Sequence, residues 1–343
     1  MNKIVYCDFL FLKDFLKSRP KYKEDPMEDD APMQSWKKMY QFICASKTHL
    51  NISQSKYLSE AKRDVELIHF HKRCTNLRFS EDGIDFFDKG CVNDIEKLNS
   101  VYFSSRNKIV REELSKELGI IVLGKQDISK FEKLFRERTI AIPKNDEQFK
   151  KWSDIDFPEY RNTANSLIIV DNYVLKTKTQ PESLLQLLDI LLPEKLNTMF
   201  HLSIYTYIHY RDRNPQCCDV IIREIKKLRQ SDLLDIKIVV CGVELVKFHD
   251  RIIISNNMWI DCGSGFDLFT GGQANKRTNI RFAFPFMMNP ANRKSWENEA
   301  YIYLIKDLLQ EEKPSTSHNY TYDYWGDESR DNRLLTYYKN NLL

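Results

Sequence analysis

The sequence predicts an α/β protein of two domains, and three observations support this. Both halves of the chain alternate short apolar, β-branched runs with helical spacings, a pattern typical of parallel sheets covered by helices. A length of 343 residues suffices for two domains of ordinary size, and 42% apolar residues suffice for compact cores. The polar stretch Thr139–Asn165 lacks any sustained period. We therefore expect an N-terminal α/β domain over 1–145, a linker over 146–163, a second domain over 164–313 and a loosely ordered polar tail over 314–343.

The elements of the first half follow from its local patterns. The β-branched run "KIVYCD" predicts a strand over 3–8, and "THLNIS", "NSVYFSS" and "IIVLGK" predict strands over 48–53, 99–105 and 120–125. Helical spacing predicts helices over 33–46, 54–73 and 106–119, the last of them ended by Gly119. The charged, proline-containing stretch 19–32 predicts an exposed loop.

The second half repeats this alternation. Strands are expected over 166–175, 200–208 and 235–242, with helices between them over 180–193 and 219–231. Pro181 is placed to begin the first of these helices and Pro193 to end it. The runs "RIIIS" and "MWIDC" flank Asn256-Asn257 and predict a hairpin. A final helix is expected over 291–312.

Composition narrows the class of protein. The net charge of +3 is too small to identify a nucleic-acid binder, because that depends on local clustering. No uninterrupted apolar run approaches the roughly 20 residues that a membrane span requires. The first 18 residues contain Asp8 and Lys13, so they predict a strand and a helix rather than a signal peptide. Eight cysteines without a CxxC pair indicate reduced thiols and a cytoplasmic protein.

One segment of the second half carries polar residues at spacings that suggest chemistry. It reads H-x-R-x4-N-x6-G-S, with His249, Arg251, Asn256, Gly263 and Ser264. An imidazole can attack a phosphodiester phosphorus covalently, while a second histidine protonates the leaving group. A neighbouring cation neutralises the phosphoryl oxygens, and hydroxyl and backbone N–H groups donate further hydrogen bonds. This chemistry needs neither a metal nor another cofactor.

The segment resembles the signature of the phospholipase D superfamily, in which lysine and aspartate stand at the positions of Arg251 and Asn256. A strand ending in Asp-x-Tyr precedes that signature, and Asp171-Asn172-Tyr173 fits this place. The resemblance covers about 166–309 and implies a mixed sheet with helices on both faces. It also implies His249 as nucleophile, assisted by Arg251, Asn256 and Ser264. Since the chain holds one signature and the chemistry needs two histidines, a symmetric homodimer is expected.

The same segment also resembles the phospholipase D-like C-terminal domain of MIT-domain-containing proteins, which binds phosphoinositide membranes. The shared residues include His249-Asp250-Arg251, Trp259-Ile260 and Phe266-Asp267. This resemblance implies a phosphate-recognising pocket and leaves hydrolysis open. Gly263, Lys276, Arg277 and Arg281 are the expected substrate-binding residues, although a solvated loop explains the three basic residues equally well.

The first half resembles a PIN-type ribonuclease domain faintly. Asp8 would end its first strand and Glu60 would lie on the helix after the second, where such acids hold divalent cations. Arg106 and Asn107 stand where a further aspartate is expected, so a degenerate domain is one interpretation. The alternative role for Asp8 is to cap the helix that follows it.

Three hypotheses therefore remain. The first is a metal-independent phosphodiesterase, acting on nucleic acid in preference to lipid, in a layout seen in microbial defence proteins. The second is an inactive phospholipase D-like module that binds anionic phospholipid headgroups or a nucleic-acid backbone. The third is a metal-dependent nuclease in the first half, targeted by the second half.

Overall fold

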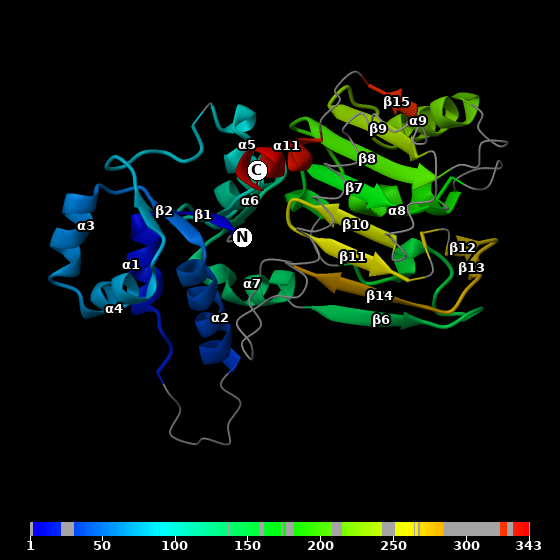
Figure 1. Cartoon of the computed structure of the whole chain (residues 1–343). Helices are drawn as coiled ribbons and strands as arrows, with labels where there is room; N and C mark the ends of the chain where they lie inside the picture. Colours follow the sequence, from blue (N-terminus) through cyan, green and yellow to red (C-terminus); the bar gives the residue numbers. More distant parts are fainter. Residues whose placement is uncertain are drawn as a thin grey trace. The chain divides into compact units, whose positions relative to one another are not determined.

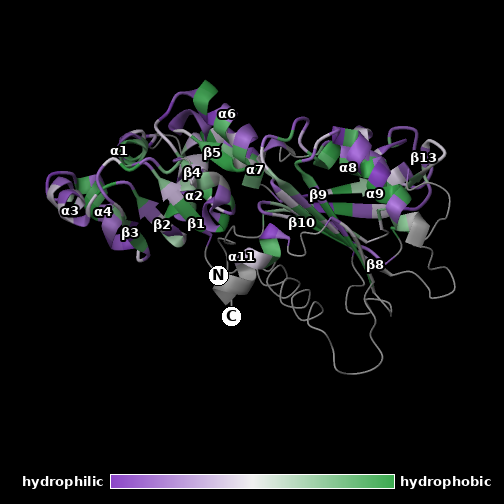
Figure 2. Cartoon of the chain, turned by 90° about the horizontal axis from the view of Figure 1, so that it is seen from above, coloured by the Kyte–Doolittle hydropathy of each residue, from purple (hydrophilic) through white to green (hydrophobic). Residues whose placement is uncertain are grey.

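The structure is a computed structural model of an α/β protein, and its described residues form two compact units that divide the chain at Arg136 and Glu137 (Figure 1). Hydrophobic residues recur along the helices and strands, whereas many of the loops are hydrophilic (Figure 2). The described residues are 3–21, 31–88, 90–135, 137–157, 161–172, 174–175, 182–207, 215–241, 251–263, 265–266, 268–284, 323–327 and 332–342.

The first unit is built on a five-stranded sheet in which all strands are parallel, in the order β3-β2-β1-β4-β5. Each predicted strand of this half is present, because short β-branched and aromatic runs that are buried on both faces suit a parallel sheet. The strands are β1 (Ile4–Cys7), β2 (Lys47–Leu50), β3 (Leu77–Phe79), β4 (Val101–Phe103) and β5 (Ile121–Leu123).

Helices cover this sheet and bury aromatic side chains against it. On one face Phe11 stacks on Phe103 with ring centroids 5.2 Å apart, and on the other Tyr6 stacks on Tyr102 at 5.1 Å. The helices of the first unit are α1 (Phe9–Lys17), α2 (Ala31–Ala45), α3 (Gln54–Ala61), α4 (Val65–Arg73), α5 (Ile95–Leu98), α6 (Lys108–Leu118) and α7 (Ile128–Phe135), with short 3-10 turns η1 (Cys91–Asn93) and η2 (Lys125–Asp127).

The prediction of one long helix over 54–73 is wrong, because two helices, α3 and α4, occupy this stretch. Asp64 interrupts it: its carboxylate accepts hydrogen bonds from the backbone N–H groups of Glu66 and Leu67 and so caps the start of α4. Asp is a strong N-cap residue, so its position inside the predicted helix was the available signal.

The second unit is built on an eight-stranded mixed sheet in the order β15-β9-β8-β7-β10-β11-β14-β6. Strands β7, β8 and β9 are parallel, and the strands on either side of them run antiparallel. The strands are β6 (Arg138–Ile142), β7 (Ser166–Val170), β8 (Phe200–Tyr207), β9 (Leu234–Cys241), β10 (Arg251–Ser255), β11 (Trp259–Cys262), β14 (Thr278–Ala283) and β15 (Asp323–Gly326), with a separate small pair β12 (Phe269–Thr270) and β13 (Gln273–Ala274).

Two predicted helices connect the parallel strands of this sheet. Helix α8 (Glu182–Leu191) links β7 to β8, and α9 (Pro215–Arg229) links β8 to β9. Both connections run in the same direction along the sheet, so right-handed crossovers place both helices on one face. The helix predicted over 291–312 lies outside the described residues. None of the described helices is both long and apolar enough to cross a membrane.

The predicted linker contributes to the second unit instead of connecting two domains. Residues 138–142, which our domain boundary placed in the N-terminal domain and for which no strand was predicted, form β6 and pair along its length with β14. Trp152 lies in the 3-10 turn η3 (Trp152–Asp154), is fully buried and packs edge-on against Phe269 at 5.2 Å. A second turn, η4 (Arg161–Thr163), precedes β7. The polar composition of this stretch predicts an exposed linker, whereas the burial of its one tryptophan fixes it in the core of the second unit.

The predicted polar tail is also wrong for the part that the structure describes. Strand β15 pairs with β9, and α11 (Arg333–Leu342) buries Leu334, Leu335 and Tyr337. Asn332 precedes α11, and its amide donates to the carbonyl groups of Leu167 and His201, each at 3.2 Å. The polar, tyrosine-rich composition of 314–343 predicts a loosely ordered tail. Within it, however, the apolar residues of α11 recur at helical spacing and form one buried face.

Burial of Lys3 makes the stability of the first unit depend on pH. Its side chain precedes β1 and is 6% exposed, and desolvation lowers its pKa from 10.5 to about 7. The unfolded chain therefore keeps this proton to higher pH than the folded chain does, so the free energy of unfolding rises between pH 7 and 10. The contribution is at most about 1.4 kcal/mol per pH unit. Urea unfolding at pH 7, 8 and 9 should show this rise in the native protein and a flatter profile in Lys3→Met; parallel profiles would contradict the burial.

Gly326 is the position at which β15 tolerates no side chain. Its φ is +121°, and a Cβ atom there would lie 2.0 Å from the carbonyl oxygen of Ile236 on β9. Gly326→Ala should lower the free energy of unfolding by at least about 2 kcal/mol, because strain adds to the clash. Gly263→Ala is the control, since nothing lies within 4 Å of its Cβ position. Hydrogen exchange at β9 should accelerate in Gly326→Ala; equal protection in both variants would show that β15 is not docked there.

Candidate functional site

Each sheet has one place where successive connections leave in opposite directions. In the first unit this place lies between β1 and β4, because β2 and β3 lie on one side of β1 and β4 and β5 on the other. In the second unit the comparable place lies between β7 and β10, where the connection from β7 runs to β8 and that from β10 runs to β11; β10 is antiparallel to β7, so its amino end lies beside the carboxyl end of β7. In a parallel sheet, loops diverge at the carboxyl ends of the strands in such a place and leave room for a ligand. The polar residues at these two edges are the candidate functional residues.

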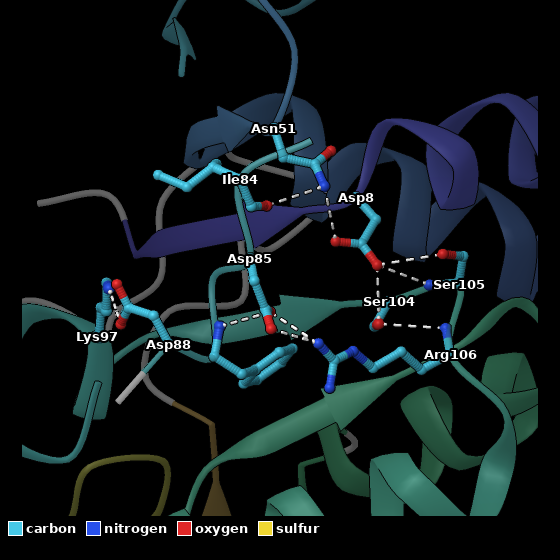
Figure 3. Close-up of polar contacts among 10 residues, drawn as sticks. Asp8, Asn51, Ile84, Asp85, Asp88, Lys97, Ser104, Ser105 and Arg106 are labelled. Atoms are coloured by element: carbon cyan, nitrogen blue, oxygen red, sulfur yellow. Dashed lines mark hydrogen bonds and ion pairs between the residues drawn. The ribbon is translucent and has the colours of Figure 1, made fainter. Parts of the chain in front are cut away.

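Asp8 follows β1 and receives four hydrogen bonds at the first edge (Figure 3). Its Oδ2 accepts from the Ser104 hydroxyl at 2.8 Å, from the Ser105 N–H at 3.0 Å and from the Ser105 hydroxyl at 3.3 Å. Its Oδ1 accepts from the Asn51 amide at 3.3 Å. Asp8 therefore joins the ends of β1, β2 and β4. It occupies the N-cap position of α1, yet its side chain makes no capping bond, so the alternative role as a helix cap is wrong.

Asn51 extends this network to the loop after β3. Its side-chain oxygen accepts the N–H of Phe9 at 2.7 Å, and its amide also donates to the carbonyl of Ile84 at 3.4 Å. The backbone carbonyl of Asn51 accepts the N–H of Gly83 at 3.1 Å. The loop over residues 80–88 is thereby tied to the same edge as Asp8.

An ion pair crosses this edge from that loop to the loop after β4. Nη2 of Arg106 lies 2.7 Å from Oδ1 and 2.8 Å from Oδ2 of Asp85 (Figure 3). The guanidinium carbon of Arg106 lies 5.1 Å from the ring centroid of Phe87. In the sequence Arg106 departs from the acidic pattern of a PIN-type domain, and no motif singles out Asp85.

The described acidic residues of the first unit do not gather as the metal site that the PIN-type resemblance implies. Glu60 is bound to Lys13, whose ammonium donates to Oε2 at 2.8 Å, and this hydrogen bond lowers the pKa of Glu60. Asp8 accepts four hydrogen bonds from protein donors, three of them at Oδ2. Across the described part of the chain, no three His, Cys, Asp or Glu side chains gather as a metal-binding group.

At the second edge Asp171 follows β7 and holds the loop after β11. Its side chain is 2% exposed, and its Oδ2 accepts the N–H of Phe266 at 2.9 Å. Arg251 begins β10, and the register that pairs Ile252 with Val170 places it opposite Asp171 when continued by one residue. The partly exposed guanidinium of Arg251 donates to the carbonyl of Gly263 at 2.7 Å. The structure therefore brings Arg251 and Gly263 together, as the resemblance implied.

A buried serine fixes the same loop from its other side. The carbonyl of Phe266 accepts the hydroxyl of Ser183 at 2.8 Å, and Trp152 Nε1 donates to the same hydroxyl at 2.9 Å. Gly265 has a φ of +95°, which favours glycine at this bend. Sequence reasoning missed Ser183, because a serine in the first turn of an amphipathic helix carries no distinctive signal.

Asn256 lies at the opposite end of β10 from Arg251, about 17 Å away along an extended strand of five residues. It is fully buried; its Oδ1 accepts the N–H of Asn165 at 3.2 Å, and its amide donates to the carbonyl of Thr163 at 3.4 Å. The predicted turn at Asn256-Asn257 is confirmed by the bond from the Ser255 N–H to the Met258 carbonyl. Asn256 fastens this turn and does not meet Arg251.

The three basic residues after the motif divide into two groups. Lys276 and Arg277 are exposed and immediately precede β14, whose first residue, Thr278, has its hydroxyl 3.9 Å from the Cys262 sulfur. They therefore lie near the edge that holds Arg251. Arg281 is an interior residue of β14, and its Nε donates to Glu137 at 2.6 Å, so its expected substrate contact is replaced by an ion pair.

Two of the predicted catalytic residues, His249 and Ser264, lie outside the described residues. Asp171 was noted in the sequence as part of a strand-end pattern, and the structure adds its bond to the loop that follows the hairpin. No known protein family matches this chain. No curated protein matches it either.

The network around Asp8 predicts that removing its carboxylate lowers the free energy of unfolding more than removing the carboxylate of Glu60. Asp8→Ala leaves four donors without their acceptor and should lower the free energy of unfolding by about 2–3 kcal/mol. Glu60→Ala removes the same charge but only an exposed ion pair, and should have little effect. Equilibrium urea unfolding of both variants checks this. If both lost the same stability, Asp8 would not organise the edge.

Proposed function

We propose that the protein recognises phosphodiesters, with nucleic acid as the preferred partner, at the β7–β10 edge of the second unit. The observation that carries this proposal is the position of Arg251: a partly exposed guanidinium at a sheet switch point, opposite a buried aspartate and anchored to the carbonyl of Gly263. A guanidinium held in this way has already lost much of its freedom, and its planar, permanently charged group suits phosphate oxygens.

The surroundings of Arg251 support an anionic ligand. Lys276 and Arg277 add positive charge near the same edge, and phosphate contacts of this kind are independent of base sequence. Glycine at positions 263 and 265 leaves the backbone of this loop open to close approach by a ligand. His249 is two residues before Arg251 in the sequence, and we propose it as the nucleophile.

Full catalysis under this proposal takes two copies of the chain. The second histidine that protonates the leaving group would come from a symmetric partner, so the proposed enzyme is a homodimer. The proposed location is the cytoplasm, which agrees with the free thiols of Cys7, Cys44, Cys74, Cys91, Cys218 and Cys262. The alternative metal-dependent nuclease in the first unit is less well supported, because its residues do not fit a metal site.

Binding to a fluorescent single-stranded oligonucleotide in EDTA tests the role of Arg251. Arg251→Ala should weaken binding by about tenfold or more and reduce the dependence of log K on log salt by about one counterion. Arg251→Lys keeps the charge and should retain most of the affinity. Arg281→Gln removes the same charge from an ion pair on β14 and is the matched control. Equal losses in Arg251→Ala and Arg281→Gln would mean that only net charge matters and would contradict the proposal.

Product analysis in the same reactions separates binding from cleavage. Cleavage that persists in EDTA and is lost in His249→Ala supports the phosphodiesterase. Oligonucleotide binding without cleavage would favour the alternative of an inactive module that only recognises nucleic acid. Binding only to vesicles of anionic phospholipid, again lost in Arg251→Ala, would exclude nucleic acid as the partner and leave the lipid alternative. A monomer in solution during active cleavage would contradict the shared histidine pair.

A further inference from the structure

The second unit contains a buried arginine that the proposed function does not use. Arg333 is the first residue of α11 and is 7% exposed. Its backbone N–H donates to Nδ1 of His201 on β8 at 3.1 Å, and its Nη1 donates to the carbonyl of Asn165 at 3.4 Å. Asn165 immediately precedes β7, so Arg333 lies at the amino end of this strand, whereas Arg251 lies beside its carboxyl end.

Two other buried arginines each pair with a carboxylate. Nη2 of Arg111 lies 2.7 Å from Oδ2 of Asp127, and its side chain is 3% exposed. Nη1 of Arg229 lies 2.7 Å from Oδ1 of Asp189, and its side chain is 5% exposed. Among the described residues Arg333 makes no such ion pair, and both of its hydrogen bonds go to uncharged groups. Desolvation lowers its pKa from 12.5 to about 10. A buried charge without a counter-charge costs free energy, which a bound anion would offset.

The guanidinium of Arg333 has one unused edge. Its Nε and Nη2 have no hydrogen-bond partner in the described part of the chain, and neither atom is fully buried. These two groups lie on the same edge of the guanidinium plane, and their parallel N–H bonds match the two oxygens of a carboxylate. The bond from Nη1 to Asn165 holds the opposite edge.

A buried hydroxyl faces the same side of the sheet as Arg333. Ser166 begins β7 and is in register with His201 on the neighbouring parallel strand, so both side chains point to the face on which Arg333 lies. Ser166 is fully buried, and its Oγ is without a hydrogen-bond partner among the described residues. The carbonyl that Nη1 of Arg333 contacts belongs to the residue before Ser166. Ser166 therefore offers a second donor to an acceptor that Arg333 binds.

The start of α11 holds Arg333 in position. Asn332 caps this helix, because its Oδ1 accepts the N–H of Leu334 at 3.0 Å, while its amide donates to the Ser203 hydroxyl at 3.1 Å. A ligand would thus meet a side chain whose backbone is already fixed. A cation in the first turn of a helix opposes the helix dipole, so α11 gains no stability from the charge of Arg333.

The neighbouring charges leave the positive charge of Arg333 uncompensated. Strand β9 adds one charge of each sign to this face: Asp235 is in register with His201, and Lys237 with Ser203. Neither accounts for the lowered pKa of Arg333, whose cause is desolvation. One uncompensated positive charge suits a ligand group with one negative charge, which is the charge of a carboxylate.

We propose that Arg333 and Ser166 bind a carboxylate group, that of a small organic acid or of a peptide C-terminus. The two carboxylate oxygens accept the N–H groups of Nε and Nη2, and one of them also accepts the Ser166 hydroxyl. This site lies at the opposite end of β7 from Arg251, so it does not depend on phosphodiester recognition.

Thermal unfolding of the full chain in sodium acetate measures this site, with uncharged acetamide at the same ionic strength as the reference. Acetate should raise the unfolding midpoint by about 2–4 °C relative to acetamide, because it binds the folded state. Arg333→Met should abolish this difference. Without acetate it should unfold at the same or a higher temperature than the native protein, since it removes an unpaired buried charge. Ser166→Ala keeps the charge and should reduce the acetate shift.

Arg229→Met is the matched control, because it removes an equally buried arginine that has its own carboxylate. It should unfold at a lower temperature with or without acetate, and it should keep the acetate shift. General effects of the salt act on all variants alike. N-acetylated tetra-alanine with a free or an amidated C-terminus then identifies the source of the carboxylate. A larger shift from the free peptide than from acetate assigns the site to a peptide C-terminus, and the reverse assigns it to a small organic acid.

The remaining outcomes overturn the proposal. Equal acetate shifts in the native protein and in Arg333→Met would show that no carboxylate binds at Arg333. A loss of stability in Arg333→Met as large as that in Arg229→Met would show that the guanidinium is satisfied by the protein itself. Stabilisation by inorganic phosphate and not by acetate would contradict the assignment to a carboxylate.

Discussion

One constraint recurs in both units: a carboxylate at the end of a buried strand accepts backbone N–H groups from the loop of another strand. Asp8 accepts the N–H of Ser105, and Asp171 accepts that of Phe266. Loops at the edge of a sheet leave such N–H groups without partners, and a charged acceptor satisfies them strongly. In each unit this bond fixes a loop that contacts or contains an arginine. The candidate chemistry therefore depends on where these two aspartates lie.

Much of the fold was predictable from the sequence because its signals are local. Short β-branched runs predicted β1, β2, β4 and β5 of the first sheet and β7 to β11 of the second, and Asn256-Asn257 predicted the hairpin turn. The edge strands β3, β6 and β15, and β14, were not predicted. The errors arose where one residue outweighs its surroundings. Asp64 divides a helix by capping, and Trp152 draws a polar segment into the core of the second unit. The cap at Asp64 is a local signal within the helical pattern, whereas the burial of Trp152 depends on tertiary contacts, which composition and periodicity do not record.

The candidate sites were predictable only in part. The spacing of the motif placed Arg251 and Gly263 close together, because both belong to one hairpin and its following loop. It misplaced Asn256, since residues five apart on an extended strand lie at opposite ends of it. Partners from distant segments had no local signal: Ser183 reaches Phe266 across 83 residues, and Asp85 reaches Arg106 across 21. In both units an arginine at the sheet edge is restrained by protein oxygens.

A crystal structure of the full chain with a phosphorothioate dinucleotide would test the central claim most directly, because anomalous scattering from sulfur locates the ligand without prior assumptions. Our account predicts a sulfur peak within hydrogen-bonding reach of the Arg251 guanidinium, at the edge where β7 ends and β10 begins. A well-occupied dinucleotide elsewhere, with Arg251 still bound only to protein groups, would contradict it.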